Sequence, residues 1–296
     1  MQDLTKSKIY SLLPCRAPTA HKATQGSVVA LAGSTAYRGA AALCVEGALR
    51  TGAGLVYLAS IEPVLALALA RTPECCALPC RTADAGGPLP ADAAARCTPL
   101  AAPRAVLLAG PGLGSGAGAA VAAVLNAPWG GAVLDADALN ALAAGQLAAP
   151  LPNNCVLTPH PGEMARLLHT TPAAVQADRA ACAAQCARAT GCVVVLKGPG
   201  TLIAAPSGAM RRNTTGNAGL ARGGSGDVLA GMIAALLAQG LPAFDAAACG
   251  VWLHGAAADA CAARQSMAAM LPHDILQDLG GLFLQAEQSQ KGASFP

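Results

Sequence analysis

VVALAGSTAYRGAAALCVEGALRTGAGLVYLA, residues 28–59, holds one complete strand–helix–strand unit. Its two ends, Val28–Ala32 and Leu55–Ala59, are short apolar runs with the length of buried strands. Between them, the Ala-rich segment Gly39–Arg50 has the length and composition of a helix. A connection of this length joins parallel strands, which a short hairpin cannot do. The stretch therefore predicts a βαβ unit.

The same alternation continues along the chain and predicts five further strands and five further helices. The strands are expected at Ala105–Ala109, Ala132–Asp135, Cys155–Thr158, Val193–Lys197 and Thr201–Ala204. The helices are expected at Ala117–Asn126, Pro172–Thr190, Gly226–Gln239, Phe244–Ala262 and Pro272–Leu284. The last two strands are too close in sequence for a crossover, so they should pair antiparallel at one edge. We expect an α/β fold with three layers and a mostly parallel central sheet.

The stretch Thr72–Arg104 is the weakest part of this pattern. It is rich in Pro, Ala and Asp and shows little periodicity. A linker between two domains would have this composition, but both flanks continue the same alternation of strands and helices. We therefore interpret it as a surface excursion within one domain that spans residues 1–296.

Composition and charge exclude several classes of protein. The chain has 296 residues, of which 54% are hydrophobic and 12% charged, so it is not intrinsically disordered. Its net charge is +3 without a basic block, which argues against nucleic acid as a partner. The mean hydropathy of +0.45 raises the question of a membrane span. The longest apolar runs are too short or contain charged residues, and no signal peptide is readable, so we expect a soluble, cytoplasmic protein.

The 12 cysteines raise the question of a zinc site or disulfides. They do not show the paired C-x2-C spacing of a zinc site. Most of them stand inside apolar runs such as Leu43–Val45 and Cys192–Val194. We therefore expect buried thiols in a reducing compartment, where cysteine behaves as a small hydrophobic residue.

Polar or Gly-rich clusters follow five of the predicted strands. In a parallel sheet the carboxyl ends of the strands meet at one edge, and ligands bind beyond that edge. Five such clusters argue for a single extended site rather than for unrelated turns. The clusters are Gly33–Thr35, Gly110–Gly116, Asp135–Asp137, Thr158–Glu163 and Lys197–Gly198.

The strongest local signal is NAGLARGGSGD, residues 217–227, which leads directly into an apolar helix. Glycines before a helix let successive backbone N–H groups converge on one point, and the helix N-terminus adds partial positive charge there. An anion cradle is therefore expected, formed by Gly223, Gly224, Ser225 and Gly226. Asp227 would repel an anion there, which suggests that it acts as a base or orients a hydroxyl group. An ordinary N-cap is an equally open interpretation of Asp227.

A second Gly-rich stretch, Gly114–Ala119, fits a loose G-x-G-x-x-A dinucleotide fingerprint, with Asp135 21 residues after Gly114. The glycines begin before this window, however, and Asp135 belongs to a DAD cluster at the end of the next strand. We therefore disfavour a dehydrogenase of the Rossmann type.

Two histidines receive different interpretations. His160 stands between two prolines, which keep it outside a helix and present its ring from a rigid turn. Contact with a ligand is favoured for His160 over an incidental position at a helix start. His254 lies within an apolar helical segment and is expected to be a packed helix residue.

Several motifs in a fixed order carry a resemblance to a known family. They are GSTAYRGAA, GPGLG, DADALN, TPHPGEMARL and GNAGLARGGSGDVLAG. From about His21 to about Asp274 the chain resembles the bacterial ADP-dependent NAD(P)H-hydrate dehydratases of the ribokinase-like superfamily. Many relatives carry an epimerase domain before this region. Only about 20 residues precede His21 here, so we expect that domain to be absent.

The resemblance implies a ribokinase-like fold and a repair reaction. The (6S) form of hydrated NADH or NADPH, called NADHX or NADPHX, would be dehydrated while ADP is converted to AMP and phosphate. It further implies Mg2+ as cofactor, ADP as co-substrate and a homo-oligomer with four subunits. It also implies a separate NAD(P)HX epimerase as a partner.

The resemblance also assigns residues to roles, and Asp227 would be catalytic, accepting or orienting the hydroxyl proton. Contacts to the hydrated nicotinamide nucleotide would come from Ala40, Gly112, Gly114, His160 and Asp227. Contacts to the adenosine nucleotide would come from Lys197, Gly198, Pro199, Gly200, Thr201 and Gly226. Metal ligands stay open. The family has Thr where Arg222 stands, and Arg222 either contacts phosphate or points to solvent.

Two other functions compete with this one. A ribokinase-like kinase for a vitamin precursor, such as a hydroxymethylpyrimidine or a hydroxyethylthiazole, would share the GSGD cradle but would not require TPHPGEM. A non-catalytic nucleotide sensor is the third interpretation, and the intact cradle and Asp227 argue against it.

Overall fold

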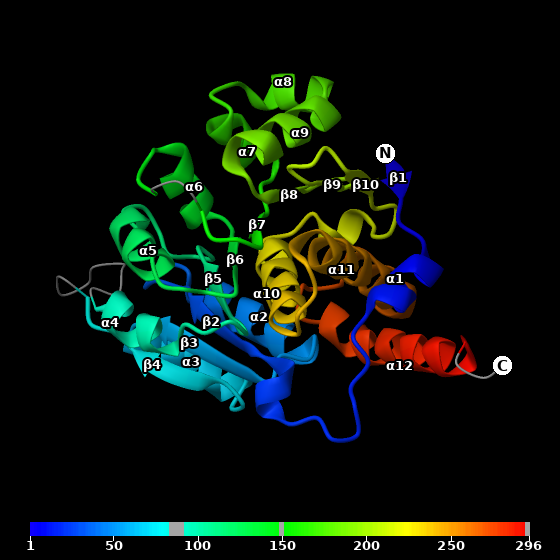
Figure 1. Cartoon of the computed structure of the whole chain (residues 1–296), viewed down its shortest axis with the longest axis horizontal. Helices are drawn as coiled ribbons and strands as arrows, with labels where there is room; N and C mark the ends of the chain where they lie inside the picture. The colour runs from blue at the N-terminus through cyan, green and yellow to red at the C-terminus, as the bar shows by residue number, and fades with distance from the viewer. Residues whose placement is uncertain (83–91, 148–150, 294–296) are drawn as a thin grey trace.

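The computed structural model describes residues 1–82, 92–147 and 151–293. Its strands form one sheet in the order β1-β10-β9-β8-β7-β6-β5-β2-β3-β4 (Figure 1). The central strands are β2 (Ser27–Leu31), β3 (Leu55–Ser60), β5 (Ala105–Ala109), β6 (Gly131–Leu134), β7 (Cys155–Leu157) and β8 (Val193–Leu196). The outer strands are β1 (Gln2–Asp3), β10 (Met210–Arg212) and β9 (Leu202–Ala204) at one edge and β4 (Cys76–Pro79) at the other.

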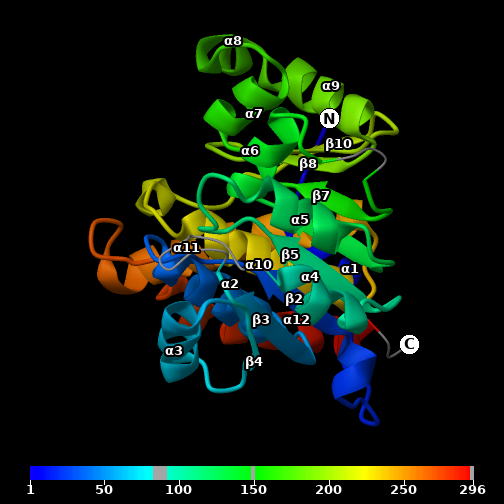
Figure 2. The same cartoon turned by 90° about the vertical axis from the view of Figure 1, so that its left-hand side faces the viewer.

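Helices cover both faces of this sheet. One face carries α1 (Lys6–Leu12), α2 (Arg38–Arg50), α3 (Glu62–Arg71), α10 (Ser225–Ala238), α11 (Ala243–Gln265) and α12 (Ile275–Ala293). The other carries α4 (Ala93–Cys97), α5 (Gly118–Leu125), α6 (Asp137–Ala143), α7 (Pro161–Leu167), α8 (Pro172–Ala177) and α9 (Arg179–Thr190). Figure 2 shows α7, α8 and α9 at one end of the molecule and α3 with β4 at the other.

Side chains of β2 alternate between the two layers. Val28 and Ala30 pack in one core with α2 and α10, whereas Val29 and Leu31 pack in a second core with α5. Because successive side chains of a strand point to opposite faces, a strand covered on both sides is apolar throughout. This burial explains the continuous apolar runs in the sequence, and it confirms the predicted three-layer α/β/α architecture.

The predicted antiparallel pair at the sheet edge is also confirmed. β8 pairs antiparallel with β9, with Val195 opposite Ile203, and Gly198–Gly200 form the tight turn between them. The sequence analysis did not predict β10, which continues the edge antiparallel to β9, or β1, which pairs with β10.

The stretch Thr72–Arg104 was predicted as a surface excursion, and this is wrong for part of it. Cys76–Pro79 forms β4, which pairs parallel with β3 and widens the sheet. These four residues include no β-branched side chain, so their sequence shows no strand pattern. The strand forms because it pairs with β3, and not because its residues favour the extended conformation. Residues 83–91 lie outside the described part of the chain.

The predicted helix Pro172–Thr190 is divided at Asp178 into α8 and α9. Asp178 has a non-helical φ of −144°, and its side chain accepts a hydrogen bond from the Ala181 N–H group. Asp competes with the helix backbone in this way and therefore favours the start of a helix over its interior.

The 12 cysteines are free thiols, and most of them are buried, as predicted.

Among the described residues, none of the helices combines the length and the apolar character that a membrane span requires.

The order of the strands determines where a ligand can bind. From β2 the chain proceeds outward through β3 and β4, whereas β5 and the strands after it lie on the opposite side of β2. The switch point of the sheet, where ligands commonly bind in such folds, therefore lies between β2 and β5. The loops after these two strands are joined there by a hydrogen bond from the Gly33 N–H group to the Pro111 carbonyl at 2.8 Å.

Candidate functional site

A cavity of about 710 Å³ opens beyond the carboxyl ends of β6, β7 and β8. Its walls include Asp135 after β6, His160 after β7 and the turn Lys197–Thr201 after β8. The start of α10 with Gly223–Asp227, His254 of α11 and most of the segment 213–222 also line it. Three of the five predicted clusters thus meet in one cavity. Its volume suits a small-molecule ligand.

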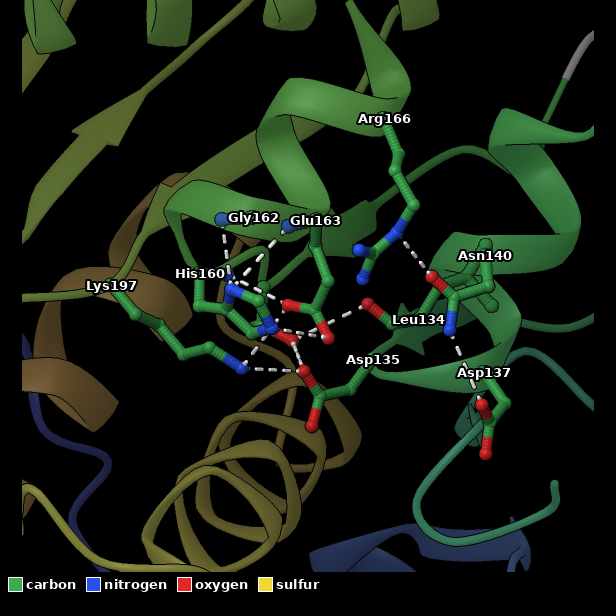
Figure 3. A network of polar contacts seen from close by, with 10 residues as sticks. Leu134, Asp135, Asp137, Asn140, His160, Gly162, Glu163, Arg166 and Lys197 are labelled. Atoms are coloured by element: carbon green, nitrogen blue, oxygen red, sulfur yellow. Dashed lines mark hydrogen bonds and ion pairs between the residues drawn. The ribbon is translucent and has the colours of Figure 1, made fainter. Parts of the chain in front are cut away.

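A buried cluster of charged groups lies at the base of this cavity (Figure 3). The Lys197 Nζ atom is 2.8 Å from Asp135 Oδ1 and 3.8 Å from Glu163 Oε2. The Thr158 hydroxyl donates to the same Asp135 oxygen at 2.7 Å. Burial acts to lower the pKa of Lys197, but Asp135 and Glu163 outweigh it and raise that pKa above its usual value. Lys197 is therefore an ammonium ion fixed between two carboxylates.

The N-terminus of α7 is closed by its own side chains. His160 Nδ1 accepts hydrogen bonds from the N–H groups of Gly162 at 2.9 Å and Glu163 at 3.4 Å. Glu163 Oε2 accepts from the His160 N–H group at 2.7 Å, which completes a capping box. Burial and the Lys197 charge lower the pKa of His160. Since Nδ1 is an acceptor, the neutral ring carries its proton on Nε2, and this nitrogen lies 3.5 Å from Glu163 Oε1.

The N-terminus of α10 is open. Gly224 is its N-cap, with φ 97°, and it supplies no side-chain hydrogen bond to the helix. The positive φ of Gly224 favours glycine, and a Cβ atom there would also displace the end of the Leu43 side chain, which it would meet at 2.6 Å. The first N–H groups of α10 lack a capping side chain, which is the arrangement expected for binding an anion. The alternative in which Asp227 is the N-cap is wrong, because Gly224 holds that position.

Asp227 is the third residue of α10 and lines the cavity. Burial and the nearby Asp135 carboxylate raise its pKa to about 7, against the opposing effect of Lys197. A carboxylate with this pKa is half ionised near neutral pH and can accept a proton and release it again. Its chemistry therefore fits a general base.

The turn Lys197–Thr201, predicted to hold the adenosine nucleotide, lines the cavity over its whole length. Arg179 donates to the backbone carbonyl groups of Leu196 at 3.1 Å and Lys197 at 3.3 Å. The Thr201 hydroxyl donates to the Gly198 carbonyl at 2.8 Å. These hydrogen bonds fix the backbone of the turn, and the surface of the turn that lines the cavity can contact a ligand.

The remaining predicted substrate residues lie at the switch point, outside the lining of the cavity. The Gly112 α-carbon packs against Ala40 and Tyr37, so that a Cβ atom there would meet both at 2.8 Å. The Gly114 N–H group donates to Asp137 Oδ2 at 2.7 Å. Ala40, Gly112 and Gly114 therefore form a second group beside the cavity, and their contact with substrate stays a prediction.

Some residues of the site were assigned no role from the sequence or only an incomplete one. Asp135 was weighed in a dinucleotide fingerprint and Glu163 belonged to a cluster after a strand, but neither was assigned a role in the site. His254 is buried in its helix, as predicted, but it also lines the cavity, and its Nε2 atom has no hydrogen-bond partner among the described residues. Burial lowers the pKa of His254 to about 4. Arg222 lies at the cavity wall and donates to the Ala268 carbonyl at 2.9 Å.

Comparison with proteins of known sequence identifies similar enzymes. The chain is 43% identical over 283 residues to the bifunctional NAD(P)H-hydrate repair enzyme Nnr of Moorella thermoacetica, covering 93% of this chain and 52% of that protein. It is 41% identical over 274 residues to the ADP-dependent (S)-NAD(P)H-hydrate dehydratase of Neisseria meningitidis, covering 90% of this chain and 88% of that one. The chain thus spans about half the length of the bifunctional relatives that it matches.

Solved structures agree with the sequence comparison. The ADP/ATP-dependent NAD(P)H-hydrate dehydratase of Bacillus subtilis, co-crystallised with ATP/Mg2+, has a TM-score of 0.82 and 31% identity, covering 96% of this chain and 98% of that chain. A ribokinase-like superfamily protein of Enterococcus faecalis has a TM-score of 0.82 and 28% identity, covering 96% of each chain. The family model described as NAD(P)H-hydrate dehydratase matches residues 28–280. The chain therefore belongs to the NAD(P)H-hydrate dehydratase family and has a ribokinase-like fold.

Proposed function

We propose that the protein dehydrates the (6S) forms of NADHX and NADPHX to NADH and NADPH, with conversion of ADP to AMP and phosphate. The observation that carries this proposal is the pairing of an open helix N-terminus with Asp227 in one cavity. The first supports a phosphoryl group, and the second accepts a proton from an attacking hydroxyl group. Membership of the dehydratase family identifies the hydroxyl group as the one added by hydration of the nicotinamide ring.

Dehydration needs a better leaving group than hydroxide. In the proposed reaction the substrate hydroxyl oxygen attacks the β-phosphorus of ADP, the bond to the bridging oxygen breaks, and AMP leaves. Asp227 takes the hydroxyl proton. The carbon–oxygen bond of the resulting phosphate ester then breaks and phosphate departs with the bonding electrons. The neighbouring ring carbon loses a proton to water, and the electrons of its C–H bond form the new carbon–carbon double bond. The α10 N-terminus stabilises the charge on the transferring group throughout.

We propose that the two ligands contact two groups of residues, those that line the cavity and those at the switch point of the sheet. The nucleotide would lie on the turn Lys197–Thr201 and on Gly226, at the cradle Gly223–Gly226. The hydrated nicotinamide would lie between Asp227 and the switch-point loops that carry Ala40, Gly112 and Gly114. His160 would donate a hydrogen bond from Nε2 to an oxygen of the substrate.

Mg2+ is part of the proposal because the Bacillus subtilis dehydratase was co-crystallised with ATP/Mg2+. Within the described residues, no group of three or more His, Cys, Asp or Glu side chains could hold a metal ion. The described part of the chain therefore offers no such cluster of its own side chains. Mg2+ commonly binds through substrate phosphates and water, and it would then enter with the nucleotide.

We further propose that residues 1–296 act as one ribokinase-like domain in the cytoplasm, as a homo-oligomer, and together with a separate epimerase. The epimerase would supply this protein with the (6S) epimer of the hydrated nucleotide. Gel filtration with light scattering tests the oligomer, for which a tetramer is expected.

The deciding experiment incubates the purified protein with NADHX and either ADP or ATP. Recovery of the absorbance of the reduced nicotinamide, with AMP and phosphate as the products from ADP, is expected. No recovery with either nucleotide contradicts the proposal. A stable phosphorylated alcohol without dehydration would favour the vitamin-precursor kinase, and ADP binding without phosphate release would favour the sensor.

A further inference from the structure

The position of the Lys197 ammonium is not explained by the role in holding adenosine that the sequence suggested. Its Nζ atom lies in the charged cluster at 2.8 Å from Asp135 Oδ1. A Cβ atom built on Gly226 would lie 3.2 Å from Nζ. The ammonium therefore faces the second residue of α10, at the N-terminus that would receive an anion.

Lys197 also has donor capacity to spare. An ammonium group has three N–H donors. One donates to Asp135 Oδ1, and Glu163 Oε2 lies at 3.8 Å, beyond hydrogen-bond distance. Lys197 lines the cavity, and 20% of its side chain is exposed there. At least one donor is thus available to a ligand at the first turn of α10.

We propose that Lys197 is a further catalytic residue, whose ammonium contacts the phosphoryl group during its transfer from the nucleotide to the substrate hydroxyl. Asp135 is the positioning residue that aims it. The proposal rests on the function proposed above, because it requires that a phosphoryl group is transferred. Lys197 would contact that group and not the adenosine part of the nucleotide.

The charges around Asp227 connect this proposal to a measurable pH dependence. Four elements place ionisable groups against Asp227: Asp135 after β6, Asp137 in α6, Glu163 in α7 and Lys197 after β8. The three carboxylates raise the pKa of Asp227, and Lys197 lowers it. The Cys44 thiol of α2 also faces Asp227, but burial raises its own pKa well above the usual value, so it is uncharged.

The first test compares pH profiles of kcat/KM for Lys197→Met, Lys197→Arg and Asp135→Asn. Lys197→Met should lower kcat by about 100-fold to 1000-fold, as loss of a donor to a developing charge does. It should also move the acid limb of the profile to higher pH, because the cation that lowers the Asp227 pKa is lost. Asp135→Asn should move that limb to lower pH. Lys197→Arg should restore part of kcat.

Opposite shifts of the acid limb would not result from general damage to the fold. Lys8→Met, on the exposed face of α1, is the matched control for loss of a lysine and should behave as wild type. Circular dichroism and thermal melting check that each variant is folded. The proposal is overturned if Lys197→Met raises KM for ADP while kcat and the acid limb stay unchanged.

The second test needs no turnover and therefore separates this inference from the proposed function. Calorimetry measures the affinities of wild type and Lys197→Met for ADP and for AMP, which lacks the transferred phosphoryl group. The variant should keep its AMP affinity and lose the additional affinity for ADP. An equal loss for both nucleotides would place Lys197 on the part they share and would overturn the proposal, whether or not NADHX is a substrate.

Discussion

The helices α7 and α10 both carry a carboxylate as the third residue of their first turn, Glu163 in one and Asp227 in the other. In α7 the N-cap His160 and Glu163 bond reciprocally with the backbone, so the helix N-terminus is satisfied by the chain itself. In α10 the N-cap is Gly224, which supplies no side chain, and Asp227 is left beside an open N-terminus. The difference shows that the capping residue decides whether the first N–H groups of a helix are bonded by the chain itself or left without a capping side chain.

The sharpest test of this comparison is Asp227→Asn. The amide keeps the shape of the side chain but cannot accept the hydroxyl proton, so kcat should fall by about 100-fold to 10,000-fold. AMP affinity should stay close to that of wild type, because the open N-terminus is unchanged. Steady-state kinetics with NADHX and ADP, together with calorimetry of AMP, measure both quantities. Turnover at the wild-type rate would show that Asp227 has no role in proton transfer.

The pH dependence of the wild type gives the second largest effect. Asp227 must be ionised to act as a base, and burial with Asp135 raises its pKa to about 7. Below that pH, kcat/KM should fall by about tenfold per unit, and above it the value should level off. A profile that is flat between about pH 5.5 and 8 would contradict the assignment.

The free energy of unfolding should show the cost of keeping Asp227 charged. The folded pKa of about 7 lies above the usual 3.8, so the stabilising effect of the protonated form is complete below about pH 4 and is lost as pH rises through 7. Asp227→Asn should therefore be more stable than wild type at pH 8, by roughly 2 kcal/mol, and nearly equal to it at pH 4. Urea unfolding at both pH values measures the difference, and equal stability at pH 8 would contradict it.

A smaller effect is expected when the open N-terminus is partly filled. In Gly226→Ala the new methyl group would lie 3.2 Å from Lys197 Nζ, a flexible neighbour that can move. The fold should be kept, and ADP affinity should fall by about tenfold, since the methyl group occupies space at the cradle. Gly280→Ala, in α12 with no atom within 4 Å of the new methyl group, is the matched control and should bind ADP as wild type does.

The smallest effect concerns the closed N-terminus. His160→Ala removes the acceptor that caps α7, which should lower the free energy of unfolding by about 1 kcal/mol. Urea unfolding near neutral pH measures it. If the variant kept the stability of wild type, the capping box of α7 would contribute nothing to the fold, and the contrast between the two helices would lose its basis.

Much of the fold could be predicted because its signals are local. A short apolar run such as Val28–Ala32 has the length and composition of a buried strand. A turn of three residues after Val193–Lys197 is too short for a crossover, so the next strand must pair antiparallel. The missed strand Cys76–Pro79 depends on its neighbour β3, and the break at Asp178 depends on a side-chain hydrogen bond. Neither has a periodic signal.

By itself the sequence determined the central strands and several of the helices, that polar clusters follow those strands at one edge of the sheet, and that a Gly-rich turn precedes α10. These properties follow from periodicity and from backbone freedom, which belong to the residues themselves. Only the tertiary structure decided that Lys197 lies between Asp135 and Glu163 and that Gly224 rather than Asp227 caps α10. The pKa of Asp227 depends on burial and on charges brought together from distant positions in the chain, and no local pattern contains that information.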